Sequence, residues 1–420
     1  MMRIACVVDE FPPFFRGGLG TYAMEMMPRL RKNGIDISVC SRNTGSDQVH
    51  ETWNGIPVFR PELMNIHDIL PVLSPLDVQG WAPADQNFFL ETVLFNQLAA
   101  DHLIRVHRSG ARFDLIACHD WLSAIAGVLV KRNLEIPFVF HVHSTEQGRR
   151  DEGSAVVELI ERLAAETADL MVTVSYAMKD ELVRNGYDQE KIEVIYNGVD
   201  PVKYNPERFS QQMIQEFRRE TGIWENNLIL FIGRLTQVKG PDELIRAMPA
   251  VLKNVPDAQL IILGVGEMEG ELRDLIRSLG VDRHVLMHTR LVTEEERLLF
   301  YAACDCAVFP SKYEPFGIVC IEAMAMARPV VVGATGTSGM REQVVSDGPD
   351  QCGYHINPWD PDDIATYLVR LLSDQDMMAR FGRAGRSRVI RQFTWDTAAA
   401  RTSAVYRKIK NPGCAMQAVG

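Results

Sequence analysis

The sequence lacks three features that would each point to a different class of protein. Apolar runs such as Leu228–Ile232 are far shorter than the ~18–20 residues that a membrane-spanning helix needs. The 8 cysteines are scattered without any Cys-x-x-Cys pair, which disfavours a zinc site and is typical of a reducing compartment. Basic residues are not in excess, because 44 Lys and Arg stand against 55 Asp and Glu. The resulting net charge of −11 disfavours a general nucleic-acid binder, although a few local cations could still bind a small anion.

The N-terminus enters an apolar strand-like run directly, without the hydrophobic core and cleavage site of a signal peptide. We therefore expect a cytoplasmic protein with no integral membrane segment. The length of 420 residues suggests at least two domains, each able to bury its own core.

Short apolar runs alternate with helical periodicity along the first half of the chain. This pattern predicts a parallel sheet with helices on both faces. The predicted strands are Ile4–Val8, Ile37–Cys40, Leu115–Cys118, Phe138–His141, Leu170–Val174 and Ile192–Ile195. The predicted helices are Thr21–Lys32, Asn87–His107, Trp121–Arg132 and Ala155–Ala168.

The same alternation restarts after a turn-rich segment at residues 197–201. Its predicted strands are Leu228–Ile232, Gln259–Leu263, Val285–His288, Cys306–Phe309 and Val330–Gly333. The sequence thus predicts an α/β protein with two doubly wound, Rossmann-like domains that face a cleft. We expect domains at 1–196 and 197–391, followed by a helical tail at 392–420 that crosses back onto the first domain.

A glycine-rich loop, Arg16-Gly17-Gly18-Leu19-Gly20, joins the first predicted strand to the first predicted helix. Glycines at such a turn let the backbone approach a ligand, and the helix N-terminus offers unpaired N–H groups to an anion. A tight turn that requires positive φ would explain the same glycines equally well.

Two cations, Arg234 and Lys239, follow the strand Leu228–Ile232 and precede a helix. Open α/β sheets bind ligands at this edge. A forked guanidinium and a point-charge ammonium together suit a diphosphate.

The segment Pro310–Ile318 leads into a helix that carries Glu322, eight residues after Glu314. We expect the N–H groups of Phe316, Gly317 and Ile318 to face a phosphate or sugar oxygen. Glu314 precedes the helix and Glu322 lies inside it, so the two carboxylates should contact different parts of a long ligand.

His141 and His143 follow another strand of the first half. We expect one of these two histidines to pack and the other to face the cleft. Glu146 is a possible third metal ligand, but nothing in the spacing requires one, and we expect no metal site.

Together these motifs resemble the retaining glycosyltransferases of the large family that includes the sucrose synthases and, as close relatives, the glycogen and starch synthases. The resemblance covers nearly the whole chain and implies the GT-B architecture. It rests on the Gly-Gly-Leu loop, His119-Asp120-Trp121, the His-Ser-Thr turn, Asn197-Gly198-Val199-Asp200, Gly-Arg-Leu-Thr-x-x-Lys-Gly and Glu-x₇-Glu. The segment Thr335–Met340 departs from the shorter Thr-Gly-Gly-Leu turn of relatives.

The resemblance also implies roles for individual residues of the second half. Arg234 and Lys239 would hold the donor diphosphate and stabilise the leaving group. Glu314 would bond the donor sugar, and Glu322 would bind the hydroxyls of the nucleotide ribose.

In the first half, the resemblance implies that the Gly17–Gly18 loop closes over phosphate. His143 would lie beside the donor sugar, and Asp120 would lie near the acceptor.

The function implied is transfer of an α-hexosyl group, expected to be glucose, from a nucleoside-diphosphate sugar with retention of configuration. The resemblance implies UDP- or ADP-glucose as the donor, an α-1,4-glucan as the acceptor, and no cofactor or metal. A small-molecule, lipid or other polysaccharide acceptor is the alternative. A further alternative is a protein that binds a nucleotide sugar without catalysing its transfer.

Overall fold

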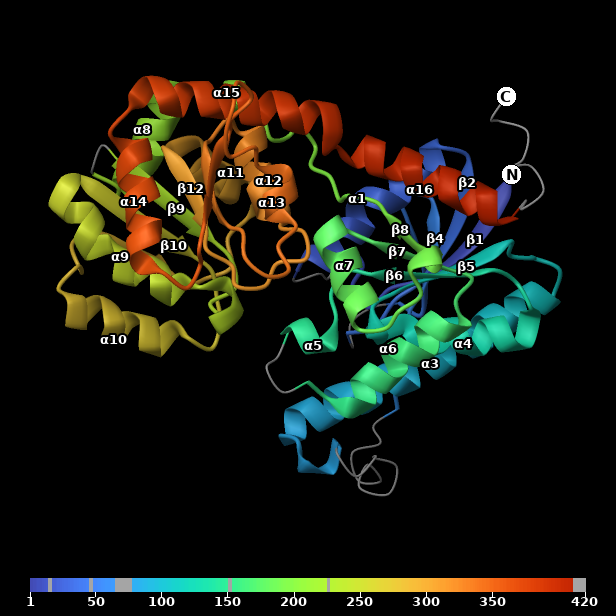
Figure 1. Ribbon diagram of the computed structural model, residues 1–420. Coiled ribbons are helices and arrows are strands. Elements are labelled where there is room, and N and C mark those ends of the chain that lie inside the picture. The colour runs from blue at the N-terminus through green and yellow to red at the C-terminus, as the bar shows by residue number, and fades with distance from the viewer. Residues whose placement is uncertain (14–16, 45–47, 65–77, 150–152, 225–226, 411–420) are drawn as a thin grey trace. The chain divides into compact units, whose positions relative to one another are not determined.

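The computed structural model describes residues 1–13, 17–44, 48–64, 78–149, 153–224 and 227–410 (Figure 1). The chain divides into two compact units. Unit 1 comprises Met1–Val174, Lys179–Tyr196 and Trp395–Gly420, and unit 2 comprises Ser175–Met178 and Asn197–Thr394. Among the described residues, no helix is both long enough and apolar enough to cross a membrane.

Unit 1 is built on an 8-stranded sheet in the order β3-β4-β2-β1-β5-β6-β7-β8. Neighbouring strands run parallel except β3 and β4, which form an antiparallel hairpin at the edge. The strands are β1 Met2–Val7, β2 Ile35–Cys40, β3 His50–Trp53, β4 Ile56–Phe59, β5 Leu115–His119, β6 Phe138–Val142, β7 Leu170–Thr173 and β8 Ile192–Val194. The hairpin was not expected from the sequence, because its strands are short and one of them, β3, is half exposed.

Helices cover both faces of this sheet. α1 (Gly18–Lys32) and α16 (Trp395–Lys410) pack together, and α3 (Pro83–Arg108), α4 (Trp121–Leu134) and α6 (Ala155–Thr167) form a second group on the other side (Figure 1). α5 (Glu146–Arg149) belongs to unit 1, whereas α7 (Tyr176–Arg184) begins in the unit 2 segment Ser175–Met178 and ends in unit 1. The start of α6 follows from local chemistry, since the Ser154 side chain accepts a hydrogen bond from the Val157 N–H group.

Unit 2 has a 6-stranded, fully parallel sheet in the order β11-β10-β9-β12-β13-β14. Its strands are β9 Asn227–Ile232, β10 Ala258–Leu263, β11 Val285–His288, β12 Cys306–Phe309, β13 Val330–Gly333 and β14 Gly353–Ile356. Its helices are α8 Gln211–Glu220, α9 Pro241–Asn254, α10 Glu269–Leu279, α11 Glu294–Ala303, α12 Ile318–Ala325, α13 Met340–Gln343, α14 Pro361–Leu372 and α15 Gln375–Gln392.

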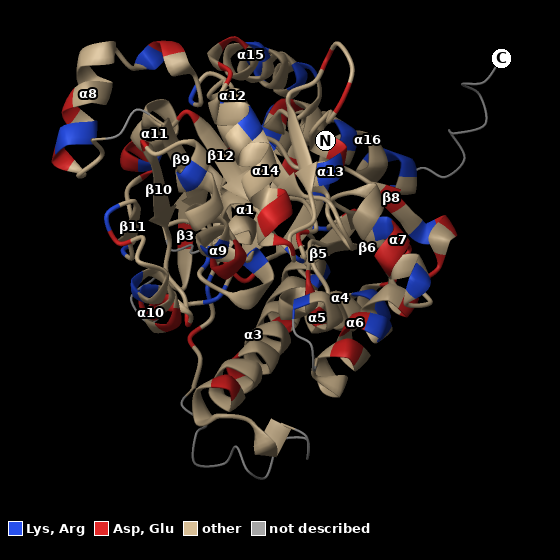
Figure 2. Ribbon diagram, turned by 60° about the vertical axis from the view of Figure 1, so that its left-hand side comes forward, with Lys and Arg blue, Asp and Glu red and all other residues tan. Residues whose placement is uncertain are grey.

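The apolar strand runs explain why this sheet is buried on both faces. Every residue of β10 is buried, and β9, β10 and β12 carry no charged side chain, whereas the charged residues lie on helices and loops (Figure 2). The sheets and their helices confirm the expected fold class of two Rossmann-like α/β units, as the structural neighbours described below also do.

The unit boundaries differ from the expected ranges at two places. Residues 392–394 belong to unit 2 and not to the tail, because Val199 donates its N–H to the Phe393 carbonyl and forms a β-bridge with Thr394. The tail segment of unit 1 therefore begins at Trp395. Ser175–Met178 also belong to unit 2, since the Ser175 hydroxyl donates to the Pro315 carbonyl oxygen at 2.6 Å.

Candidate functional site

The strand order of unit 2 places its two candidate loops next to each other. β9 lies between β10 and β12, so the order in which the strands are added reverses at β9, and open α/β sheets bind ligands at this switch point. The loop with Arg234 and Lys239 follows β9, and the loop with Glu314 follows β12. Gly240 lies where the loops touch, because a Cβ atom there would come within 2.3 Å of the Pro310 carbonyl oxygen.

Lys239 and Glu314 form an ion pair in the structure. The Glu314 side chain is largely buried, and Ser311 Oγ lies 3.5 Å from the same carboxylate. The Arg234 side chain is exposed and has no hydrogen bond or ion pair with any residue that the structure describes. The site thus contains one paired cation and one cation that is available to an anion.

The turn before α12 is shaped by Gly317, at φ +88°. A Cβ atom at this position would lie 2.4 Å from Met340 Cε, so both the backbone and the packing require glycine. The N–H groups of Gly317 and Ile318 donate to no acceptor among the described residues, as expected at a helix N-terminus. The Phe316 ring is buried, and its carbonyl accepts a hydrogen bond from Gln343 Nε2 at 2.7 Å.

Glu322 is only 2% exposed and does not contact Glu314. Its Oε1 accepts a hydrogen bond from the Tyr204 hydroxyl at 2.7 Å, and its Oε2 accepts one from the Tyr301 hydroxyl at 2.9 Å. Arg297 lies 3.6 Å from the carboxylate. The two expected carboxylates therefore have separate partners.

The segment Thr335–Met340 lies against Glu314, although its motif differs from the expected turn. The Thr337 carbonyl accepts the Glu314 N–H at 2.9 Å, and the Gly339 N–H donates to the Glu314 carbonyl at 2.8 Å. These backbone bonds fix the position of Glu314. Sequence reasoning did not assign this role to the segment, because backbone bonds leave no side-chain signature.

In unit 1, Gly17 is the N-cap residue of α1 and Gly18 is its first residue, and Arg16 lies outside the described residues. Gly17 has extended backbone at φ −147°, and no atom lies within 4 Å of the place a Cβ would take. The turn therefore does not need glycine for positive φ. The Gly17 N–H donates to Glu10 Oε2 at 3.2 Å, so this helix N-terminus already binds a carboxylate.

Asp120 has a strained backbone, with φ +53° and ψ −179°. Its Oδ1 accepts the His143 N–H at 2.7 Å and lies 3.4 Å from the Ser144 nitrogen. The strain places this carboxylate beneath the turn that carries His143. Asp120 thus holds that turn in the structure.

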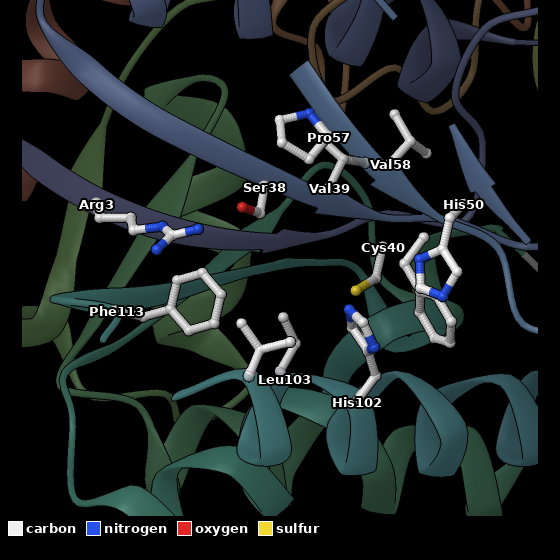
Figure 3. Close-up of a pocket in the computed structure, with 12 residues that line it drawn as sticks. Arg3, Ser38, Val39, Cys40, His50, Pro57, Val58, His102, Leu103 and Phe113 are labelled. Atoms are coloured by element: carbon white, nitrogen blue, oxygen red, sulfur yellow. The ribbon is translucent and has the colours of Figure 1, made fainter. Parts of the chain in front are cut away.

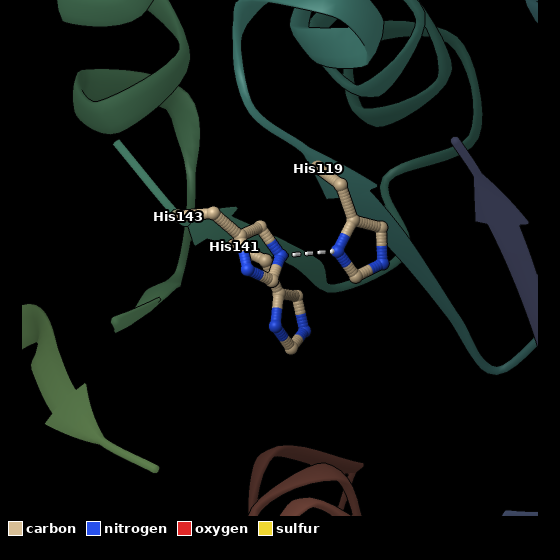
Figure 4. Close-up of side chains that lie close together, drawn as sticks. All are labelled: His119, His141 and His143. Atoms are coloured by element: carbon tan, nitrogen blue, oxygen red, sulfur yellow. Dashed lines mark hydrogen bonds between the residues drawn. The ribbon is translucent and has the colours of Figure 1, made fainter. Parts of the chain in front are cut away.

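Three histidines from β5 and the end of β6 lie together (Figure 4). His119 Nδ1 lies 3.1 Å from His143 Nε2, and His141 Nε2 lies 2.8 Å from the Tyr406 hydroxyl. His141 is buried and His143 is partly exposed, and their rings lie on the same side of the chain, with centroids 6.4 Å and planes 16° apart. Burial lowers the pKa of all three imidazoles, with neighbouring imidazoles adding to the effect for His119 and His141.

The ligand atoms of these three histidines lie within 4.8 Å of one another, which is close enough for all three to reach one metal ion. The His119 and His141 rings stack at 4.5 Å with planes 27° apart, and His143 is 26° from His119. In the structure these ring nitrogens have protein partners, because His119 Nδ1 faces His143 Nε2 and His141 Nε2 faces the Tyr406 hydroxyl. Glu146, the ligand considered from sequence, pairs instead with Arg149 at 3.2 Å.

A cavity of about 160 Å³ lies in unit 1 between α3 and the strands β1, β2 and β4 (Figure 3). His102 stacks on Phe59 at its wall, with ring centroids 3.8 Å apart. None of the residues expected from sequence to form the site lines this cavity.

The sequence also left several polar neighbours of the site unassigned. Tyr204, Arg297 and Tyr301 around Glu322 carry no motif of their own, and only the fold brings them together. His119 could have been singled out, since it stands in a motif beside Asp120.

Two Rossmann-like units, with cations and free helix N–H groups at a strand-order switch, define the class of GT-B proteins. Comparison with protein families agrees: a model of glycosyl transferases group 1 matches residues 213–388, and one of glycosyltransferase family 4 matches residues 16–203. The chain belongs to this glycosyltransferase family.

Similar proteins cover nearly the full length of the chain. An uncharacterized glycosyltransferase of Methanocaldococcus jannaschii is 33% identical over 97% of this chain and 98% of its own. A glycogen synthase of Mycobacterium tuberculosis is 30% identical over 97% and 95%. An alpha-maltose-1-phosphate synthase of Mycolicibacterium smegmatis is 29% identical over 97% and 100%.

Solved structures show the same fold at lower identity. The sucrose-phosphate synthase of Thermosynechococcus elongatus has a TM-score of 0.80 and 20% identity, over 98% of this chain and 100% of its own. The catalytic domain of starch synthase IV from Arabidopsis thaliana, bound to ADP and acarbose, has a TM-score of 0.76 and 18% identity, over 98% and 99%.

Proposed function

We propose that this glycosyltransferase moves an α-glucosyl group from UDP- or ADP-glucose to a hydroxyl of an α-1,4-glucan, with retention and without a metal. The observation that carries the proposal is the arrangement at the switch point of unit 2. Arg234, Lys239 and the free N–H groups at the start of α12 lie on loops of adjacent strands, which suits a diphosphate.

In the proposed reaction the bond from the anomeric carbon to the diphosphate oxygen breaks, and negative charge develops on the leaving group. Fixed cations and helix N–H groups stabilise that charge, as preorganised donors do in other transfer reactions. The acceptor hydroxyl attacks from the same face, loses its proton to the leaving diphosphate, and forms the new α-glycosidic bond.

The ion pair of Lys239 with Glu314 gives donor binding a defined first step. A diphosphate carries more negative charge than one carboxylate and competes for the ammonium group. As Lys239 turns to the phosphate, Glu314 becomes free to accept a hydrogen bond from a sugar hydroxyl.

The proposal gives unit 1 the remaining roles. His143 acts beside the donor sugar, and Asp120 serves the acceptor side. The Gly17–Gly18 backbone binds phosphate in place of Glu10, to which the Gly17 N–H donates in the structure. Neutral imidazole at pH 7 suits His143, because burial lowers its pKa, and it can then accept or donate a hydrogen bond without adding charge.

The names of two relatives bear on which acceptor is proposed. One is named a glycogen synthase, which favours a glucan, and another is named an alpha-maltose-1-phosphate synthase, which makes a small phosphorylated acceptor the second candidate. A lipid or another polysaccharide is the alternative within the same chemistry.

The test is release of nucleoside diphosphate from a panel of UDP-, ADP- and GDP-sugars, with glycogen, with glucose 1-phosphate, and without acceptor. We expect UDP- or ADP-glucose to turn over with glycogen, and the rate to persist in EDTA. Label entering glucose 1-phosphate and not glycogen would overturn the glucan acceptor. Nucleotide binding without turnover on any acceptor would favour a non-catalytic binding protein.

A further inference from the structure

Glu322 lies within a closed set of hydrogen-bond donors in unit 2. The Tyr204 hydroxyl donates to Oε1 and the Tyr301 hydroxyl donates to Oε2. Arg297 donates from its guanidinium to the Tyr204 oxygen at 2.8 Å and lies 3.6 Å from Glu322 itself. Residues from three parts of the chain, far apart in sequence, thus meet at one carboxylate.

Toward Glu322, both tyrosines act as hydrogen-bond donors. Burial raises the pKa of Tyr204 and of Tyr301 well above the usual range, and the charge of Glu322 raises both further. Both phenols therefore stay protonated, and each has one O–H to give. Tyr204 can give its proton to Glu322 because it accepts from Arg297.

An ionised carboxylate offers about four lone-pair positions, two on each oxygen. The tyrosines use one on each oxygen, and one on each oxygen remains. A cis-diol presents two hydroxyl donors to the two oxygens of a carboxylate. The capacity that is left on Glu322 therefore matches a ribose diol.

The place of Glu322 on its helix agrees with that match. Four residues separate it from Ile318, which corresponds to about 6 Å along the helix axis. The free N–H groups at the start of α12 suit a diphosphate. In a nucleotide the ribose is bonded directly to the diphosphate, so a carboxylate one helical turn further on suits the ribose.

We propose that Tyr204 and Tyr301 are positioning residues that fix the Glu322 carboxylate for the ribose diol of the donor. Arg297 supports them by donating a hydrogen bond to the Tyr204 hydroxyl. This inference rests on the proposed function, because it takes the ligand to be a nucleoside diphosphate. The fixed carboxylate binds the diol without reorienting, which removes an entropy cost from binding.

The variants Tyr204→Phe and Tyr301→Phe each remove one hydroxyl and keep the ring. Tyr354→Phe is the matched control, since Tyr354 is a buried tyrosine of the same unit whose hydroxyl contacts Met377 Sδ at 3.1 Å. All three are made in the full chain, and far-ultraviolet circular dichroism checks that each folds.

The probes are UDP and ADP and their 2′,3′-dideoxy forms, with binding measured by calorimetry. For the nucleotide that binds, we expect wild type to prefer the ribose form. Tyr204→Phe and Tyr301→Phe should weaken that form roughly 10-fold and leave the dideoxy form nearly unchanged. The preference for ribose then shrinks, whereas Tyr354→Phe keeps it. KM for the donor should rise with little change in kcat, because the diol is bound equally in the ground and transition states.

Equal weakening of both forms, or no change in either, overturns the positioning role, since a structural effect does not distinguish the two sugars. If one tyrosine variant does not fold, the other decides the result. Failure of wild type to bind UDP or ADP at all overturns the proposed function as well, so the two failures are distinct.

Discussion

Lys239 forms an ion pair with Glu314, although the two residues follow different strands and stand 75 positions apart. Parallel strands bring their carboxyl ends to one edge, so β9 and β12 deliver a cation and an anion to the same place. A mostly buried ion pair of this kind contributes little net stability, because desolvation offsets the attraction. Its place at the switch point fits a pair that opens when an anionic donor binds.

Arg234 and Lys239 should each be needed for turnover. We expect Arg234→Ala and Lys239→Ala to lower kcat by roughly 10²–10³, because each removes a fixed cation from the leaving group. Nucleoside diphosphate release at saturating donor measures the effect. Arg283→Ala is the matched control, since Arg283 is an exposed arginine of the same unit at the opposite end of the strands. Unchanged turnover in Arg234→Ala would remove the proposed leaving-group role.

Gly317 should tolerate no side chain. Gly317→Ala forces an L-residue to φ +88° and drives a methyl group into Met340, which together cost about 2–4 kcal/mol of unfolding free energy. Gly280→Ala is the control at φ +67°, where nothing lies within 4 Å, and it should cost only about 1 kcal/mol. Urea unfolding of the two variants measures the difference, and equal losses would contradict the packing argument.

Asp120 should act through its side-chain oxygen more than through its charge. Asp120→Asn keeps an oxygen for the His143 N–H and a side chain of the same shape, so we expect stability near wild type and less than a roughly 10-fold loss of turnover. Asp120→Ala leaves that amide unpaired and should cost about 2–4 kcal/mol. Thermal unfolding and initial rates of both variants are the measurements. An alanine variant as stable as the asparagine variant would show that the hydrogen bond is unimportant.

The sequence was most informative where local chemistry decides the structure. The apolar runs predicted β11, β12 and β13 at their observed bounds, and the motifs led to Lys239 and Glu314, which the structure joins. The edge hairpin β3–β4 was not predicted, because short, half-exposed strands give a weak hydrophobic pattern in the sequence.

Contacts between side chains distant in the chain could not be predicted from the sequence, for a different reason. Tyr204, Arg297 and Tyr301 meet Glu322 only because loops and helices distant in the chain converge. The same holds for the ladder from Cys6 to His119 to His143, in which Cys6 Sγ lies 3.5 Å from His119 Nε2. Long-range hydrogen bonds leave no spacing in the sequence, so residue type alone could not assign these roles.

The buried histidines should make unit 1 less stable in acid. Burial and the neighbouring His143 lower the pKa of His141 well below 6.5, so below that pH the unfolded chain binds a proton that the folded chain does not. Stability is therefore full above pH 6.5 and falls as the pH drops, by up to about 1.4 kcal/mol per pH unit for each such histidine. His141→Phe keeps a ring against His119 and removes the titration, so its unfolding free energy should fall less between pH 7.5 and 5.5.

Urea unfolding of wild type and His141→Phe at both pH values measures this difference. Glu161 titrates in the opposite sense, because burial raises its pKa to about 8 and its protonated form favours the folded chain. Since Glu161 is present in both proteins, subtracting the two pH dependences isolates the histidine. Loss of the Tyr406 hydrogen bond lowers the stability of the variant at every pH and cancels in the same subtraction. Identical pH dependence in the two proteins would mean that His141 takes up its proton in the folded state as readily as in the unfolded chain.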